Sequence, residues 1–588
     1  MSSLWRTIFS QVKEDLKPTA ERIDLSWRIA LICAVMVAVA MIYEIPFVAV
    51  SLFVIFYVMR SDSAESNVLA IALIILASVV VLLLLAIIQL TLPSPAMRLG
   101  VLLVTSYFLL FFGVSTQLGP LGGIIALVIT FVLSILNYVE VPEIATRGTL
   151  YAWLMAATPM AIVILANWFW GRRPKNVLLF ELKERLLSCE SLLLGQVHIS
   201  AFRTLVGEGM EAQQKRIGWL KAFRLAPKHQ IGWAEHGTLN IYRFMLALLA
   251  WERSGAMHEP KAKALNEWLA AACHQAATFI AQGKAAQFEP GLELDAGQER
   301  LLASLGARKQ AFQEMVLALH ALSKTDDFSK LSPEKTPFAQ PDIWRNPVYK
   351  HHAIKGTAAA TICYMFYSIV DWQGIHTAMI TCYVASLGTT ADTLHKLTLR
   401  IIGCLIGAAL GVLTLLFLMV HLNDVGSVLV VVFLVSLLSA WVFTGPERVS
   451  YAGIQIAFAF YLVLLHQYGP SFDFNAAWDR IVGVLVGNMM MYVFFTRLWP
   501  VGMQPSVESD LKQAQQLLKK LQQLPFSDRD GRVQTAAAVA VKLDAAHTAM
   551  QMMLFELRTI RPSPEVKRQL DRQLADLRDA FERHSFVF

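Results

Sequence analysis

The chain has 588 residues, of which 56% are hydrophobic and only 16% are charged, and its mean hydropathy is +0.50. Soluble proteins carry about 25% charged residues, so this composition excludes an ordinary soluble enzyme and indicates a polytopic membrane protein. The net charge of +7 does not indicate a nucleic-acid partner, because the basic residues lie mostly at the ends of apolar segments, where positive charge orients a protein in the lipid bilayer.

The amino-terminal half of the chain begins with a charged segment, residues 1–24, which we expect in the cytoplasm. An apolar block at 25–170 follows. Because a helix needs about 20 apolar residues to cross the bilayer core, this block predicts a first six-helix membrane half. Its spans are expected at about 26–43, 45–59, 67–92, 98–117, 120–138 and 148–170.

Residues 171–352 have the composition of a soluble domain. Apolar residues recur at helical spacing, as at Leu178, Leu182 and Leu186, and little strand signal is present. We therefore predict a cytoplasmic helical domain, and we expect it to dock with a second helical region at the carboxyl end of the chain.

A second apolar block at 353–498 predicts the second six-helix half. Its spans are expected at about 354–370, 374–388, 395–420, 426–443, 450–468 and 478–498. The remaining residues, 499–588, again show helical periodicity and predict a cytoplasmic carboxy-terminal helical domain. The distribution of Lys and Arg in the loops predicts that both termini of this multi-pass membrane protein lie in the cytoplasm.

The two apolar blocks match each other. An offset of 327 residues aligns Arg28 with Lys355, Glu44 with Asp371, and Glu65 with Asp392. An offset of 326 aligns Gly119-Pro120 with Gly445-Pro446, and a slightly larger offset aligns Arg147 with Arg480. Because each block has an even number of predicted spans, both blocks insert with the same orientation. The predicted fold is all-α, with two parallel repeats and a solute path between them.

Chemical motifs are few. The six cysteines form no CxxC pair and no metal-binding spacing; they are Cys33, Cys189, Cys273, Cys363, Cys382 and Cys404. We expect buried free thiols and neither a metal nor another cofactor. The soluble regions contain no phosphate-binding loop, zinc-protease pair or nucleophile elbow, so we expect neither ATP hydrolysis nor another enzymatic activity.

Several segments resemble the fusaric acid resistance (FUSC) family. They are Tyr43–Leu52, Asn137–Thr149, Ile362–Tyr364, Phe366–Ser368, Val370–Trp372, Gly374–Thr377 and Glu447–Tyr451. The order of six spans, a cytoplasmic region, six spans and a tail is similar as well. The resemblance implies an inner-membrane efflux component of a Gram-negative bacterium, which works with a periplasmic membrane-fusion adaptor and an outer-membrane channel. It also implies a likeness to aromatic acid exporters and, more distantly, to plant anion channels.

The second block carries the family's Arg-x-x-Gly motif at Arg400–Gly403, whereas the first block has Leu73 at the matching position. We therefore expect the two halves to differ in function. Gly403, Gly407 and Gly411 have small-xxx-small spacing, which predicts close packing of helices in lipid.

Ionisable residues inside a membrane usually face a cavity or a partner. The candidates for proton coupling are Asp371, Glu44, His376, Asp392 and Glu65. Asp371 and Glu44 lie at mirrored outer ends of spans, where partial desolvation would raise the carboxyl pKa into the range of a proton carrier. The alternative is that each is a solvated residue that caps a helix. His376 is either a proton shuttle or a hydrogen-bonded structural histidine.

Candidates for substrate contact are Arg400, Arg60, Trp372 and Lys396. Arg400 is the best anion contact because its planar fork matches a carboxylate. The basic residues and their acidic neighbours at the inner mouths gather an anionic solute or relay a proton; alternatively, they form interfacial salt bridges that only orient the helices.

The first functional hypothesis is proton-driven export of small aromatic or amphipathic compounds, including drugs, as part of a tripartite system. It predicts that Asp371→Asn abolishes drug resistance without changing membrane abundance. The alternative is a passive anion channel or facilitator, and a third class is a non-transporting scaffold or sensor. A homo-oligomer is compatible with the sequence, with trimeric and twofold arrangements both open.

Overall fold

The computed structural model describes residues 17–91, 94–135, 141–283, 296–323, 337–386, 390–422, 424–472, 474–525, 527–557 and 560–584. The all-α prediction is confirmed, because the regular structure of these residues is helical except for one two-stranded hairpin and one isolated bridge. The described residues form two compact units. Unit 1 comprises residues up to 171, 336–502 and 555–560; unit 2 comprises 172–335, 503–554 and 561–588.

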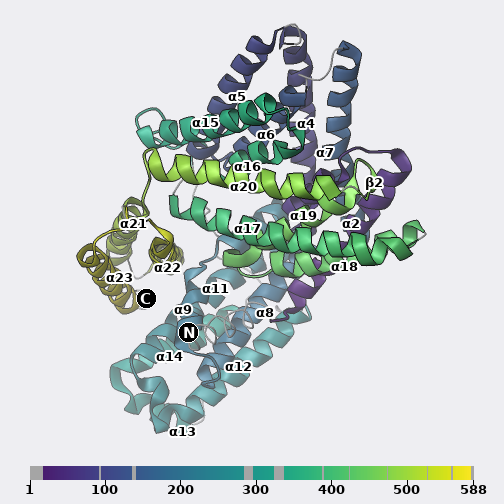
Figure 1. The fold of residues 1–588 in the computed structure, drawn as a ribbon. Helices are drawn as coiled ribbons and strands as arrows, with labels where there is room; N and C mark the ends of the chain where they lie inside the picture. The colour runs from purple at the N-terminus through teal and green to yellow at the C-terminus, as the bar shows by residue number, and fades with distance from the viewer. Residues whose placement is uncertain are drawn as a thin grey trace. The chain divides into compact units, whose positions relative to one another are not determined.

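The helices of unit 1 follow the two apolar blocks (Figure 1). The first block contains α2 (Ala20–Tyr43), α3 (Val48–Val58), α4 (Ser63–Thr91), α5 (Pro95–Ser115), α6 (Pro120–Ile135) and α7 (Pro142–Trp170). The second contains α15 (Pro347–Ile369), η6 (Gln373–His376), α16 (Thr377–Ala385), α17 (Thr390–Leu413), the π-helical turn η7 (Thr414–Leu418), η8 (Met419–His421), α18 (Val425–Phe443), α19 (Glu447–Leu464), β1 (Leu465–His466), β2 (Gly469–Pro470) and α20 (Phe474–Arg497). The turn η9 (Met553–Phe555) ends at the boundary between the units.

Local sequence explains where several of these helices begin. Ser94 accepts a hydrogen bond from the amide of Met97, and Pro95 occupies the first turn of α5, where no amide hydrogen is needed. Asp424 caps α18 in the same way through the amide of Ser427. These capping groups satisfy amides that have no partner within the helix.

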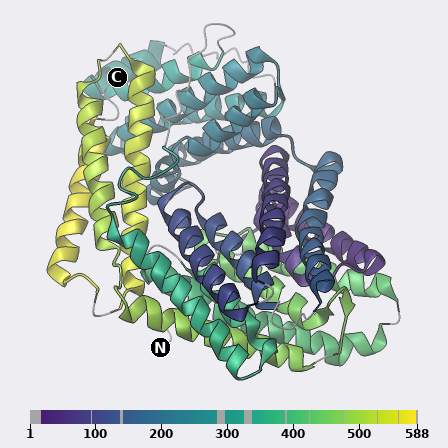
Figure 2. The same ribbon diagram turned by 90° about the horizontal axis from the view of Figure 1, so that it is seen from above.

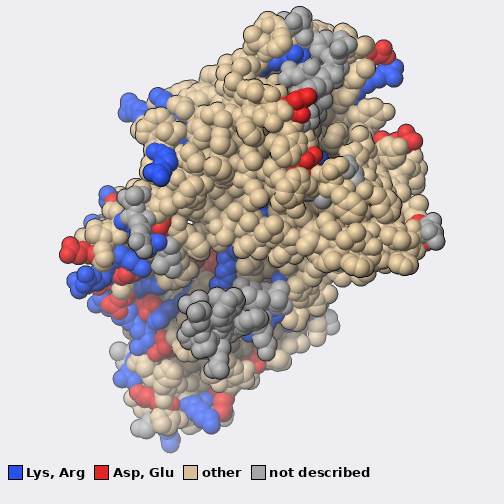
Figure 3. Space-filling view, in the orientation of Figure 1, with Lys and Arg blue, Asp and Glu red and all other residues tan. Residues whose placement is uncertain are grey.

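In its described residues each of the twelve predicted spans overlaps at least one helix; 374–388 and 395–420 each cover more than one helical element, and 450–468 extends into the hairpin. Seven helices of the described residues are long and apolar enough to cross a membrane: Ala20–Tyr43, Ser63–Gln89, Pro95–Ser115, Pro142–Trp170, Ala391–His421, Val425–Phe443 and Trp478–Arg497. Shorter apolar helices lie at Val48–Val58, Leu121–Ser134 and Arg448–Leu464. On the face seen in Figure 3 the surface over α15 to α20 is almost without charge, as expected of a polytopic membrane protein.

Helices of the two blocks pack against each other in corresponding pairs. The first helix of the first block, α2, packs along α18, the fourth of the second block, and α15 packs along α5 in the same relation. Likewise α3 packs on α19, and α16 packs on α6. Two large apolar cores result, and each contains side chains from both blocks. The blocks are therefore interlocked and do not form two separate bundles.

Residues aligned by the offset of 327 also share local structure. Arg28 and Lys355 are both buried, and each donates a hydrogen bond to a backbone carbonyl, of Ser61 at 3.3 Å and of Trp499 at 3.1 Å respectively. The two blocks therefore correspond at this position both in sequence and in the surroundings of the buried cation.

Unit 2 is entirely helical in its described residues (Figure 2). Its elements are α8 (Pro174–Leu193), α9 (Ile199–Gly207), α10 (Glu211–Ala222), α11 (Lys228–Arg253), η2 (Ala256–His258), η3 (Pro260–Ala262), α12 (Lys263–Ala281), α13 (Ala296–Ser304), η5 (Gly306–Arg308), α14 (Lys309–Ala321), α21 (Gln504–Gln523), α22 (Arg529–Met552) and α23 (Pro564–His584). The central helix α11 is buried along most of its length and contacts α8, α9, α10, α14, α22 and α23.

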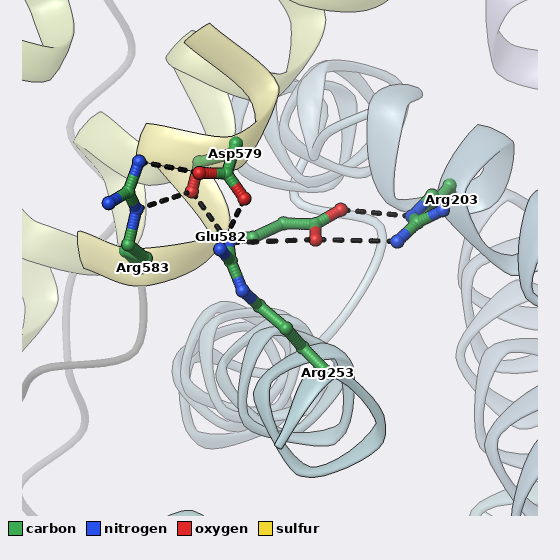
Figure 4. A network of polar contacts seen from close by, with 5 residues as sticks. All are labelled: Arg203, Arg253, Asp579, Glu582 and Arg583. Atoms are coloured by element: carbon green, nitrogen blue, oxygen red, sulfur yellow. Dashed lines mark hydrogen bonds and ion pairs between the residues drawn. The ribbon is translucent and has the colours of Figure 1, made fainter. Parts of the chain in front are cut away.

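Ion pairs connect the last helix to the rest of unit 2 (Figure 4). Arg203 of α9 binds Glu582 of α23 through both carboxylate oxygens, at 2.9 and 3.3 Å. Arg253 of α11 pairs with Asp579, which also binds Arg583. Residues 172–335 and most of the carboxy-terminal region thus contribute to one compact unit, whereas residues 336–352 belong to unit 1.

Asp544 of α22 gives unit 2 a testable pH dependence. Burial, increased by the close approach of Gly207, raises the pKa of this carboxyl, and the neighbouring Arg578 and His547 offset the shift only in part. Because the folded-state pKa exceeds the unfolded one, ionised Asp544 disfavours folding, and this cost disappears as pH falls below the unfolded pKa. We expect Asp544→Asn to raise the thermal unfolding midpoint at pH 7 but not at pH 3. Exposed Asp576→Asn is the control; an equal gain from both variants would contradict the assignment.

Candidate functional site

Unit 1 contains a cavity of about 410 Å³ with an almost entirely apolar wall. Most of the lining comes from α3, α4, α6 and α7 of the first block, and Phe458 and Leu462 of α19 close one side. Cavities of about 300–1,000 Å³ lined by apolar side chains with a few polar groups are typical of small-molecule sites. This cavity is therefore the candidate site for a solute.

The second block supplies the polar part of the wall. His376, Thr377 and Arg480 line the cavity, and Nη1 of Arg480 lies 2.6 Å from Nε2 of His376. Because a guanidinium has only donors, Nε2 accepts this hydrogen bond and carries no proton. Nε of Arg480 is buried and has no hydrogen-bond partner among the described residues. Arg480 thus places a cation in the cavity wall, which suits an anionic or strongly polar solute group.

Aromatic rings surround this polar end. The ring of Phe131 lies 5.5 Å from that of His376, and Phe47 meets Phe131 edge-on at 6.2 Å between centroids. Both phenylalanines line the cavity. They provide faces and edges against which an aromatic solute can pack.

Trp372 is not among the lining residues and acts on the cavity indirectly. Its indole Nε1 donates to Oδ1 of Asp479 at 2.8 Å. A Cβ at Gly374 would lie 1.7 Å from the other carboxylate oxygen of Asp479, and one at Gly483 would lie 2.1 Å from Oγ1 of Thr377. These contacts hold η6 and the start of α16 tightly against α20, the helix that carries Arg480. Trp372 is thus a positioning residue in this geometry.

Asp371 and Glu44 share one backbone conformation at their mirrored positions. Their φ angles are 54° and 52°, in the left-handed region, and each follows the first helix of its block. Both side chains are exposed, and neither lines the cavity. The alternative of a solvated residue at the helix end fits this geometry better.

The charged residues at the start of α17 do not line the cavity either. Arg400 is fully buried, and its Nη1 lies 3.1 Å from the hydroxyl oxygen of Tyr451. The ammonium of Lys396 lies 5.3 Å from the centroid of the same tyrosine ring. Asp392 is half-buried in the first turn. The structure therefore brings Lys396 and Arg400 together at Tyr451, away from the apolar wall.

The corresponding charges of the first block organise a turn. Nε of Arg60 is 4.0 Å from Oε1 of Glu65, and Oδ1 of Asp62 accepts a hydrogen bond from the Glu65 amide at 2.7 Å. Asp62 thereby caps the start of α4. None of these three residues lines the cavity, so their arrangement fits the orienting role better than solute contact.

The glycine ladder explains why the cavity opens in the first block. A Cβ at Gly407 would lie 2.3 Å from the carbonyl oxygen of Ile456, so α17 and α19 are in backbone contact. The offset of 327 places Leu76 and Val80 of α4 opposite Gly403 and Gly407, and both side chains line the cavity. Side chains in place of glycines keep α6 away from α4, and the cavity occupies the intervening space.

Arg480 is the main site residue that the sequence analysis missed, since it was named there only as the residue aligned with Arg147. One signal was present. Arg480–Gly483 repeats the Arg-x-x-Gly spacing of Arg400–Gly403, and both glycines allow a neighbouring helix to approach closely. Phe131 had no signal, because apolar residues are common throughout both blocks, and Phe47 appeared only within the resembling segment Tyr43–Leu52.

Comparisons with known proteins find relatives that are similar over most of the chain. Residues 362–494 match the family described as fusaric acid resistance protein-like. The chain is 26% identical over 531 residues to the multidrug resistance protein MdtO of Escherichia coli O157:H7 and of strain K12, covering 89% of this chain and 76% of those proteins. MdtO of Shigella flexneri is 25% identical over the same length, with 75% of that protein covered. No solved structure matches.

The family match falls on the block that carries His376, Arg400 and Arg480. The similarity to MdtO extends over both apolar blocks and the helical regions between and after them. Together with the apolar helices of unit 1, these similarities support a membrane protein with a transport role. Residues 362–494 are thus similar to the fusaric acid resistance protein-like family, and most of the chain is similar to the MdtO multidrug resistance proteins.

Proposed function

We propose that this chain exports small aromatic or amphipathic compounds, including drugs and aromatic acids, through the cavity of unit 1. The cavity is the observation that carries the proposal, because its apolar wall suits a hydrophobic body and Arg480 suits one polar or anionic group. The relatives named as multidrug resistance proteins support an efflux role. The interlocked corresponding helix pairs support a transmembrane unit of twelve helices in two parallel six-helix repeats.

We propose further that the proton gradient drives export through His376. Nε2 of this histidine has one lone pair, which binds either the N–H of Arg480 or a proton. A solute carboxylate that accepts hydrogen bonds from Arg480 would release Nε2, and a proton that binds Nε2 would release Arg480. Of the five proton-coupling candidates, His376 is the one that lines the cavity; Asp371, Glu44, Asp392 and Glu65 do not.

The replacement His376→Gln tests this coupling. We expect it to remove the dependence of export on the proton gradient, because an amide does not titrate, while leaving membrane abundance unchanged. The measurement is efflux of a fluorescent aromatic acid from inverted or energised vesicles across a pH series. His421→Gln, at an exposed histidine of the same block, is the matched control. Loss of export in Asp371→Asn together with normal coupling in His376→Gln would transfer the proton role to Asp371.

Tripartite assembly is a further part of the proposal. We place the chain in the inner membrane of a Gram-negative bacterium with both termini in the cytoplasm, alongside a periplasmic adaptor and an outer-membrane channel. The short connections α2–α3, α4–α5, α6–α7 and α17–α18 support this arrangement, because they offer no domain that could cross the periplasm. Export to the medium should therefore require co-expression of an adaptor and a channel; equal export without them would refute this part.

Passive anion flow is the second candidate function, and the buried Arg400 beside Lys396 is the observation that favours it. Electrical recording from planar bilayers separates the two functions. Currents that follow the anion gradient and ignore pH would establish a channel, whereas proton-coupled efflux without such currents would establish an exporter.

A further inference from the structure

The second block contains a buried polar cluster where the first block has its cavity. At the offsets that align the blocks, the lining residues Leu73, Ile125 and Met155 fall on Arg400, Tyr451 and Asn488. All three polar residues lie on the helices equivalent to those of the cavity, namely α17, α19 and α20. We call Arg400, Tyr451, Gln455 and Asn488 the Arg400 cluster.

Arg400 has unused donors in this cluster. Its side chain is 1% exposed, and only Nη1 is hydrogen-bonded, to the hydroxyl of Tyr451. Its Nε and Nη2 have no hydrogen-bond partner among the described residues. These two nitrogens form one edge of the guanidinium, so a single acceptor can bind both.

Other groups of the cluster share this excess of donors. Gln455 lies one turn beyond Tyr451 on α19, and its buried Nε2 also has no partner within the described part of the chain. Asn488 donates from Nδ2 to the carbonyl of Leu397 at 3.4 Å and leaves Oδ1 unused. The Arg400 cluster thus contains three unused donor nitrogens and one unused acceptor oxygen. No carboxylate of the described residues lies within ion-pair distance of Arg400.

An unpaired buried guanidinium is costly, because removing a charge from water without a partner costs several kcal/mol. The spare donors require an acceptor, and the sealed surroundings of Arg400 require a small one. We infer that the Arg400 cluster binds a small monovalent inorganic anion of halide size at a site distinct from the solute cavity. The anion neutralises Arg400 where α17, α19 and α20 meet. The two repeats thereby differ in role, with an apolar solute cavity in one and an anion site in the other.

Thermal unfolding of the full chain in detergent tests this site. Sodium chloride is titrated against sodium gluconate at constant ionic strength, since gluconate is too large for a sealed site. We expect the unfolding midpoint to rise saturably with chloride. Arg400→Leu, which places the first-block residue at this position, should lose the chloride dependence without a lower midpoint in gluconate. Arg497→Leu, at an exposed arginine of α20, should keep it.

A second measurement needs no variant. Chloride NMR lines should broaden in the presence of the wild-type chain and narrow again when bromide competes for the site. Chloride-independent unfolding of the wild type, an undiminished chloride effect in Arg400→Leu, or line broadening that bromide does not reverse would each overturn the inference. None of these measurements involves export. A negative result here would therefore overturn the anion site and leave the proposed export function standing, and a negative export result would leave the anion site standing.

Discussion

Export is expected to fall by about tenfold or more in Ala77→Trp, a loss that corresponds to at least about 1.4 kcal/mol of solute binding. Ala77 lies on the face of α4 that lines the cavity, between Leu76 and Val80. An indole at this position would project into the space that the solute is proposed to occupy. The measurement is efflux of a fluorescent substrate, normalised to the amount of transporter in the membrane.

The control lies on the same helix. Ala72 is exposed on α4 and does not line the cavity, so Ala72→Trp places the same indole outside the cavity. We expect near-normal export from this variant. If Ala77→Trp exported as well as the wild type, the solute path would have to lie elsewhere in unit 1.

Gly407→Leu should give the largest loss of folded protein. A Cβ at this position would lie 2.3 Å from the carbonyl oxygen of Ile456 and 2.9 Å from Cβ of Ala459. Because both obstacles belong to the backbone or its first side-chain atom, no rotamer change can relieve the clash, and α17 must move away from α19. Overpacking of this kind costs about 1–3 kcal/mol or more, and close small-residue contacts are a main source of helix association in lipid.

The amount of monodisperse protein extracted in mild detergent, together with its thermal unfolding midpoint, measures this effect. Gly100→Leu is the control, since a Cβ at Gly100 of α5 meets nothing within 4 Å. The packing argument requires a large difference between the two variants. Equal yields and midpoints would show that the contact between α17 and α19 does not support the fold.

The candidate site was only partly predictable. His376 and Arg400 could be selected from sequence because an imidazole and a guanidinium are rare within apolar segments. The partner of His376 could not, because Arg480 lies 104 positions further along the chain and pairs with it only through the packing of η6 against α20. Asp371 and Glu44 looked equivalent in sequence, and they share a left-handed backbone conformation. The exposure of their side chains depends on the surrounding helices, so it could not be predicted from the local sequence.

Sequence by itself determined the helical class, the location of the apolar segments and the internal correspondence between the two blocks, because hydropathy and residue spacing are local or periodic properties. The tertiary structure decided that the blocks interlock, with α2 on α18 and α15 on α5, and that the cavity opens beside α4 and not beside α17. Both outcomes depend on how closely helix backbones approach. That distance is set by contacts between residues far apart in the chain, such as Gly407 and Ile456. The sequence of one segment alone does not predict such a contact.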